Sequence, residues 1–161
     1  MMLLVLMVSV GTFAYDAKID DFYYNLNSET KEASVTYEDE YSLGSSYLGD
    51  VTIPSTITYK NIVYSVTSIG AYAFDWCSSL SSIIIPSSVT SIGDYAFEYC
   101  SSLSSIIIPS SVTSIGESAF YGCSKLESVT FEENSKLVSI GTEAFLGCSS
   151  LSSIEIPSSV T

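Results

Sequence analysis

Residues 88–110 read SVTSIGDYAFEYCSSLSSIIIPS, and related strings fill residues 65–87, 111–135 and 136–158. The four cysteines lie 23, 23 and 25 residues apart, and four phenylalanines keep the same steps: Cys77, Cys100, Cys123 and Cys148, with Phe74, Phe97, Phe120 and Phe145. A repeat of this length can bury its apolar face only against its neighbours. The sequence therefore predicts a solenoid of stacked coils.

Each repeat contains a short predicted strand, which in residues 80–86 reads LSSIIIP. Alternation places Ile83 and Ile85 on one face of this strand, and Ser82 and Ile84 on the other. Pro86 ends the strand because proline has no backbone N–H to donate. Strands of successive coils are expected to stack at about 4.8 Å.

The rest of the coil returns the chain to the next strand. Val89 and Ile92 face the interior, with the hydroxyl groups around them pointing outward. Ala96, Phe97 and Cys100 have the spacing of a single helical or 3₁₀ turn that faces the core. The expected class is α+β or mostly β, a leucine-rich-repeat solenoid of about four coils of 23–25 residues with an N-terminal β cap.

Residues 1–14 form a predicted signal peptide. The apolar string MMLLVLMVSVG at its start is too short to span a bilayer, and the small residues Thr12 and Ala14 precede a predicted cut before Tyr15. A buried strand is the alternative interpretation of this segment. The export signal favours a secreted or cell-surface location.

Residues 15–64 form a second predicted segment, which is rich in tyrosine and other β-formers and has a hairpin turn at Lys60-Asn61. Val51 and Ile53 match the rhythm of the later strands and are expected to join the first rung. We interpret this segment as the cap of the solenoid at residues 65–161. The chain stops at PSSVT, halfway through a coil, so the array is expected to be truncated at its C-terminus.

Composition excludes several classes of function. Five lysines stand against 18 acidic residues, for a net charge of −13, and neither arginine nor histidine occurs. Nucleic acid is a poor partner because phosphate binding requires clustered basic residues. Without histidine, Ser-His-Asp and Cys-His relays and imidazole metal ligands are absent. We expect no enzyme activity and no cofactor, and no membrane-spanning segment after removal of the signal.

The cysteines and one acidic cluster are further candidate sites. The four cysteines share one core position, which favours buried free thiols, although an exported protein could instead form a ladder of disulfides. Glu38, Asp39 and Glu40 could hold calcium, but they lack the spacing of a calcium loop and favour a solvated turn.

The run IGxxAFxxCSxLxSIxIPSSV resembles the BspA-like leucine-rich repeats, a family of bacterial and protozoal surface proteins. The resemblance extends from Ser65 to Thr161, and residues 14–64 resemble the lead-in to such arrays. It implies a secreted or surface protein, and some relatives adhere to host matrix proteins or to other cells. This chain departs from the pattern at Trp76 and Tyr99, where the commoner residue is glycine, as at Gly122 and Gly147.

Positions that vary between coils identify the candidate binding surface. Two exposed isoleucines break a ladder of serines on the strands, and aromatic residues gather near the turns. Exposed aromatic residues favour contact with protein or glycan, although they could instead pack over neighbouring coils and the hairpin near Tyr59 and Tyr64. The predicted surface consists of Ile84, Ile107, Ser82, Ser105, Tyr72, Tyr95, Trp76 and Tyr99.

Two functions follow from a solenoid with such a surface. The first is binding of an extracellular or host protein, with adhesion as its outcome. The second is a structural spacer that extends other parts of a longer surface protein, which a tandem this uniform also favours.

Overall fold

The computed structural model describes residues 15–38 and 47–161, which form strands and turns and contain no helix. The predicted signal at residues 1–14, and Asp39 and Glu40 of the acidic cluster, lie outside the described residues. The strands are β1 (Ala17–Ile19), β2 (Phe22–Asn27), β3 (Glu32–Thr36), β4 (Gly49–Thr52), β5 (Thr56–Tyr59), β6 (Ile62–Ile69), β7 (Leu80–Ile84), β8 (Ser91–Ile92), β9 (Ser105–Ile108), β10 (Ser114–Ile115), β11 (Ser128–Phe131) and β12 (Ser139–Ile140).

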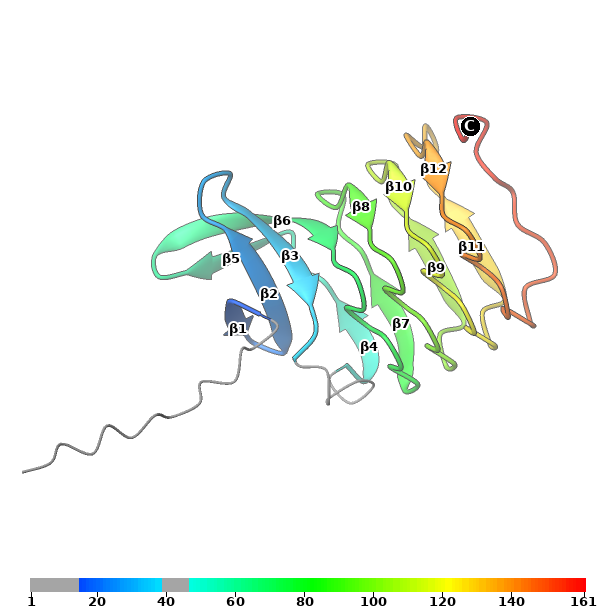
Figure 1. The fold of residues 1–161 in the computed structure, drawn as a ribbon, viewed down its shortest axis with the longest axis horizontal. Helices are drawn as coiled ribbons and strands as arrows, with labels where there is room; N and C mark the ends of the chain where they lie inside the picture. Colours follow the sequence, from blue (N-terminus) through cyan, green and yellow to red (C-terminus); the bar gives the residue numbers. More distant parts are fainter. Residues whose placement is uncertain (1–14, 39–46) are drawn as a thin grey trace, which may run out of the picture.

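The strands form two sides of a solenoid, and the turns form a third. One side is the sheet β1-β2-β3-β6-β8-β10-β12, in which β5 also pairs with β6. The other side carries the parallel pairs β4-β7 and β9-β11. Successive coils lie side by side along the long axis, with the β2–β3 and β5–β6 hairpins at the N-terminal end (Figure 1). The mostly β repeat solenoid is confirmed.

Register between coils follows the repeat. Ser91 and Ile92 of β8 pair with Ser114 and Ile115 of β10, which occupy the same positions of the next repeat. Alternation within β7 is also as predicted, because Ile83 and Ile85 are buried and Ile84 is exposed.

Stacked phenyl rings fill the centre of the core. Phe74, Phe97, Phe120 and Phe145 lie face to face, with ring centroids 5.0, 5.1 and 5.2 Å apart and planes within 4° of parallel. Val89, Ile92, Ala96 and Cys100 are buried with them, as the sequence predicts.

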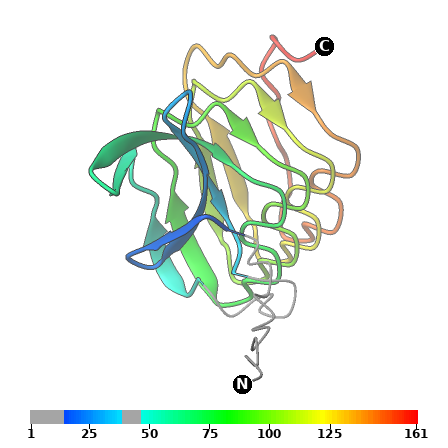
Figure 2. The same cartoon turned by 60° about the vertical axis from the view of Figure 1, so that its left-hand side comes forward.

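The helical or 3₁₀ turn predicted around Ala96, Phe97 and Cys100 is wrong, because this segment consists of consecutive turns. Tyr95 and Tyr99 have positive φ angles, which interrupt a right-handed helix. Alternate N–H groups also donate to the next coil instead of along the chain, as Phe97 N does to Ala119 O at 2.7 Å. Figure 2 shows these turns stacked in register along one side of the molecule.

Gly93 allows the coils to approach closely. A β-carbon at this position would lie 2.6 Å from the backbone nitrogen of Ala71 and 2.8 Å from the carbonyl carbon of Gly70 in the preceding coil. Its φ angle is not positive, so the residue is required by the contact between coils and not by a left-handed corner.

Side-chain hydroxyls add a further link between coils. The second serine of each PSS motif donates to a carbonyl of the preceding coil at 2.6 Å, as seen for Ser88 with Val66, Ser111 with Val89 and Ser159 with Leu137. The prediction that the hydroxyl groups of this segment point outward is wrong for this position.

The N-terminal residues continue the solenoid. β3 pairs in parallel with β6, and Val51 of β4 pairs with Ile83 of β7, so the predicted first rung is present. Lys60 and Asn61 both have positive φ angles in the turn between β5 and β6, as a two-residue hairpin requires. The Tyr47 ring packs 4.5 Å from that of Phe74. These contacts support the predicted cap, which stays a prediction, as do the count of four coils and the domain boundaries.

Replacing Phe97 with alanine should remove the centre of the ring stack. We expect Phe97→Ala to lower the free energy of unfolding by about 3–5 kcal/mol, because a large cavity would open between two coils. Ser105→Ala, on the exposed face of β9, should change it by less than about 0.5 kcal/mol. Equal shifts of the two midpoints in urea unfolding would contradict this register.

Ser111→Ala tests the hydroxyl link. The substitution leaves the Val89 carbonyl without its side-chain donor, so we expect a loss of about 0.5–1.5 kcal/mol in urea unfolding. Ser105→Ala is again the matched control, and the same small change in both variants would show that the hydroxyl of Ser111 does not stabilise the stack.

Candidate binding surface

The strand face consists of Ser82, Ile84, Ser105 and Ile107 on β7 and β9, which lie side by side (Figure 1). Ile84 and Ile107 are 62% and 57% exposed, although both follow buried isoleucines in their strands. Ile84 is opposite Thr52 in the β4–β7 ladder, and Ile107 is opposite Thr130 in the β9–β11 ladder. The face is therefore a small apolar area bordered by hydroxyl groups.

The aromatic edge consists of Tyr72, Tyr95, Trp76 and Tyr99 on the turns of two successive coils. Tyr72 and Tyr95 stack with centroids 4.9 Å apart and planes 3° from parallel, and Trp76 and Tyr99 pack at 4.3 Å with a tilt of 38°. Tyr72 is still 40% exposed and Trp76 50% exposed. The rings thus pack over neighbouring coils and also face solvent. In the described chain, the other ring contacts of the edge are those of Tyr72 with Tyr37 and of Tyr99 with Tyr121. Tyr64 of the hairpin is instead buried in the core.

All four aromatic residues of the edge have left-handed backbones, with φ between 53° and 59°. Trp76 is the third residue of the turn that Cys77 N closes on Phe74 O at 3.1 Å, and this position of a turn favours glycine. The left-handed conformation explains Gly122 and Gly147 at the same position of later coils, with φ of 70° and 80°. Each non-glycine residue costs about 1–2 kcal/mol in this conformation.

Gly122 is required for a second reason. A β-carbon there would lie 2.6 Å from Cδ1 of the Tyr99 ring, which covers this glycine. The Tyr99 ring also meets Tyr121 edge to face, with centroids 5.5 Å apart. The aromatic edge therefore ends at Tyr99, because the next coil has glycine at the equivalent position.

Each of the two coils carries a carboxylate directly before its second aromatic residue, and neither carboxylate was among the predicted site residues. Asp75 is only 5% exposed, and its Oδ1 atom has no hydrogen-bond partner. Burial and then the nearby Glu98 raise the pKa of Asp75 to about 6, against a smaller opposing effect of the Trp76 backbone N–H. Glu98, on the next coil, is half-buried, and burial raises its pKa. The available sequence signal was that each of these acids directly follows a phenylalanine predicted to lie in the core.

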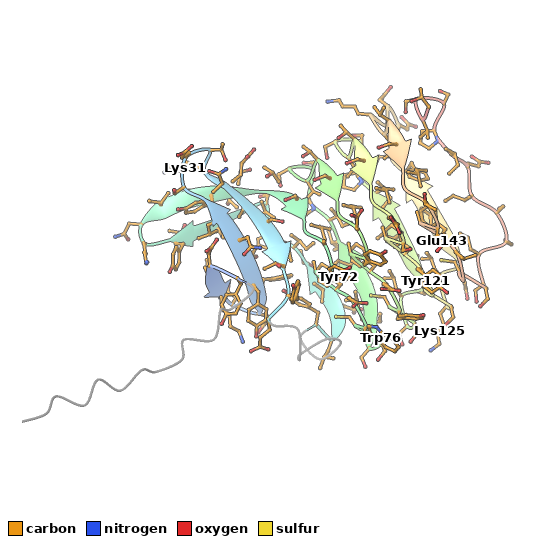
Figure 3. The ribbon with its side chains drawn as sticks, viewed as in Figure 1. Lys31, Tyr72, Trp76, Tyr121, Lys125 and Glu143 are labelled. Atoms are coloured by element: carbon orange, nitrogen blue, oxygen red, sulfur yellow. The ribbon has the colours of Figure 1, made fainter. Side chains whose placement is uncertain are left out.

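Further acidic groups surround the aromatic edge. Tyr95 donates its hydroxyl to Glu117 Oε1 at 3.0 Å, and the backbone N–H of Glu117 donates to Asp94 Oδ1 at 2.8 Å. Figure 3 shows Tyr72, Trp76 and Tyr121 on the turn side of the coils, with Lys125 near Tyr121 and Glu143 further towards the C-terminal coils. Lys31 lies far from them, at the tip of the β2–β3 hairpin.

The four cysteines are free and buried. Three thiols donate to the backbone of the preceding coil at 3.1 Å: Cys100 to Phe74, Cys123 to Phe97 and Cys148 to Phe120. Burial raises the pKa of Cys77 to about 12 and that of Cys100 well above its ordinary value. These thiols therefore link successive coils from buried positions.

Residues 15–38 and 47–161 contain no group of three or more acidic or cysteine side chains that could hold a metal ion. Glu38 is described, but its neighbours Asp39 and Glu40 are not, so the calcium interpretation stays untested. Within the same ranges no helix is long and apolar enough to cross a membrane.

The buried thiols should be unreactive in the folded protein. Burial of all four thiols, and the raised pKa values of Cys77 and Cys100, predict that a thiol reagent at pH 8 labels the cysteines only after unfolding in urea, when four groups should react. Rapid labelling of the native protein would contradict the inward position of the cysteines, and fewer than four groups after unfolding would indicate a disulfide.

Asp75 should destabilise the fold at neutral pH. Its pKa rises from 3.8 to about 6 on folding, so the native state holds the proton longer and the free energy of unfolding falls as pH rises through this window. We expect Asp75→Asn to raise the free energy of unfolding by about 1–3 kcal/mol at pH 8 and to change it little at pH 4. Glu133→Gln, at an exposed carboxylate, is the matched control. A stabilisation equal at both pH values would show that the buried charge is not its cause.

Comparisons with known proteins agree with this architecture. Residues 56–161 match the family described as BspA type leucine rich repeat region (6 copies). No curated protein matches the chain in sequence.

Several solved structures share the fold. A leucine rich repeat protein of T. pallidum is 24% identical, with a TM-score of 0.65 over 88% of this chain and 72% of its own. A leucine-rich repeat protein of Bacteroides capillosus is 29% identical, with a TM-score of 0.52 over 89% of this chain and 83% of its own. One from Bacteroides ovatus is 28% identical with a TM-score of 0.52, and the match covers 89% of this chain and 48% of that protein.

The family match covers most of the chain and all of the described coils from β6 onward. The resemblance found in the sequence is therefore confirmed, and the chain belongs to the BspA-type leucine-rich-repeat family.

Proposed function

We propose that this protein is secreted or held at the cell surface, and that it binds another protein through its strand face and aromatic edge without catalysing a reaction. The observation that carries the proposal is the aromatic edge. Four large rings are kept at left-handed turn positions, where glycine would be less strained, and two of them are 40% and 50% exposed. Strained, exposed aromatic residues are typical of a surface kept for binding.

The strand face supports the same function. It lies next to the aromatic edge around the coil, because the turn at Cys77–Leu80 joins the two sides directly, with Leu80 N donating to Cys77 O at 3.0 Å. The two surfaces therefore occupy adjoining parts of the same coil. Aromatic residues supply large contact area at a low cost in side-chain entropy.

Location is supported by the sequence. The signal-like residues 1–14 and the membership of a family whose relatives include surface proteins both favour export. Buried free thiols are compatible with that location, because no cysteine of the array is accessible to oxidation in the folded state.

A spacer is the second candidate. The last two coils have Gly122 and Gly147 in place of Trp76 and Tyr99, Ser118 and Glu143 in place of Tyr72 and Tyr95, and Thr130 and Glu155 in place of the exposed isoleucines. These coils present few features for recognition, and an array of this kind extends a surface without contacting a ligand.

Two double variants separate the candidates. Trp76→Gly with Tyr99→Gly, and Ile84→Ser with Ile107→Ser, use residue types that other coils or this surface already have, so folding should survive. A screen of extracellular proteins would supply the partner. We expect each pair to weaken binding at least about tenfold, which corresponds to about 1.4 kcal/mol.

Val63→Ser with Val138→Ser is the matched control, since both valines are exposed but belong to neither surface. We expect this control to leave the dissociation constant unchanged. If both test pairs change it by less than about tenfold, these surfaces are not the contact site and the spacer is favoured.

A further inference from the structure

We propose that the carboxylate pair Asp75 and Glu98 binds a lysine or arginine side chain of the protein partner, between the two aromatic pairs of the edge. This inference rests on the proposed function, since it names the chemistry that the partner presents at one of its two surfaces.

The two coils align the groups of this site. Each has the same order along the chain, an aromatic residue followed three positions later by a carboxylate and then by a second aromatic residue: Tyr72, Asp75 and Trp76, then Tyr95, Glu98 and Tyr99. The backbone bonds Tyr72 N to Asp94 O at 3.0 Å and Trp76 N to Glu98 O at 2.8 Å hold the coils in register. The hydrogen bond with Glu117 chiefly raises the pKa of Tyr95, and desolvation chiefly raises that of Tyr99. The charge of Glu98 adds a smaller contribution to both, so Glu98 lies near both aromatic pairs.

The carboxylate of Asp75 lacks a counter-charge in the described chain. Only 5% of the Asp75 surface is exposed to solvent, and its Oδ1 atom accepts no hydrogen bond. A buried carboxylate without a counter-charge destabilises a fold, and a cation placed beside it would remove that cost. The position is thus poised to accept a positive group from outside the chain.

Acidic and aromatic residues occur together in the array. The coils that carry Asp75 and Glu98 also carry Trp76 and Tyr99, whereas the next two coils have Tyr121 and Leu146 followed by glycines. If the carboxylates only solvated the surface, their presence would not depend on the neighbouring aromatic residue. The association of both features in the same two coils points to one site.

A cationic side chain fits the chemistry of both features. Ammonium and guanidinium groups are attracted to the faces of tryptophan and tyrosine, and they pair with carboxylates. Glu117 and Asp94 beside Tyr95 add negative charge, and Glu143 occupies the repeat position of Tyr72 and Tyr95 in the last coil. The net charge of −13 favours approach of a basic partner. An anionic ligand would be repelled by each of these carboxylates.

Trp76 provides a local probe because the chain has one tryptophan. The full chain would be titrated with the peptide acetyl-KGKGKGK-amide at low salt, and Trp76 fluorescence followed. We expect a saturable change, with Asp75→Asn plus Glu98→Gln raising the dissociation constant at least about tenfold.

The matched control Glu127→Gln plus Glu133→Gln removes the same charge outside the site, and should raise the dissociation constant less than about threefold. The peptide acetyl-EGEGEGE-amide should not bind.

Equal weakening in the two double variants would overturn the proposal, because it would indicate general attraction to an acidic surface. Absence of a saturable change would overturn it as well. Urea unfolding of the Asp75→Asn and Glu98→Gln variant excludes loss of folding as the cause, since removal of the buried charge is expected to stabilise the protein.

Failure of this inference and of the proposed function can be told apart with the protein partner. If Trp76→Gly plus Tyr99→Gly abolishes partner binding while Asp75→Asn plus Glu98→Gln does not, the aromatic edge binds its partner without a cation. If neither double variant affects partner binding, the edge is not a contact site.

Discussion

Hydrogen bonding between the backbones of successive coils is the constraint on which the rest of the structure depends. On the turn side, every second N–H donates to the following coil, and on the opposite side Gly93 N donates back to Ile69 O at 2.8 Å. Links in both directions fix one interval between coils, and the phenyl rings of the core repeat it at 5.0–5.2 Å. A side chain that recurs in the repeat must therefore pack against the equivalent side chain of the next coil. Flat rings, small thiols and serine hydroxyls fit this short interval.

The same interval shapes the outer surface. Tyr72 and Tyr95 are stacked like the buried phenylalanines, although they face solvent, because their backbones are held at the same spacing. Asp75 and Glu98 are brought together for the same reason, and the charge of Glu98 adds to burial in disfavouring the ionised form of Asp75. In a repeat protein, side chains at the same variable position of neighbouring coils are therefore held close together. Here this spacing concentrates aromatic rings and negative charge on one side of two coils.

Much of this fold follows from the sequence, because period and alternation report directly on packing. The spacing of Phe97 and Cys100 and the alternation through Ile83, Ile84 and Ile85 predict which side chains are buried. The left-handed backbones at Trp76 and Tyr99 could not be derived in the same way, since no local rule places an aromatic residue there, although glycine in the sister coils was a signal. The donor roles of Ser111 and Cys100 depend on contacts between coils, which a single repeat does not contain. Burial of Asp75 was missed because acids are expected at the surface.

The ring of Tyr99 that covers Gly122 makes neighbouring coils sterically dependent on each other. A side chain at position 122 would collide with this ring, so an aromatic residue in one coil restricts the choice of residue in the next. Tyr99 itself follows Trp76 at this position, and these two rings pack with a tilt of 38° instead of lying parallel. Sequence variation along this edge is consequently coupled from coil to coil, and a residue transplanted between repeats has to be exchanged together with its neighbour.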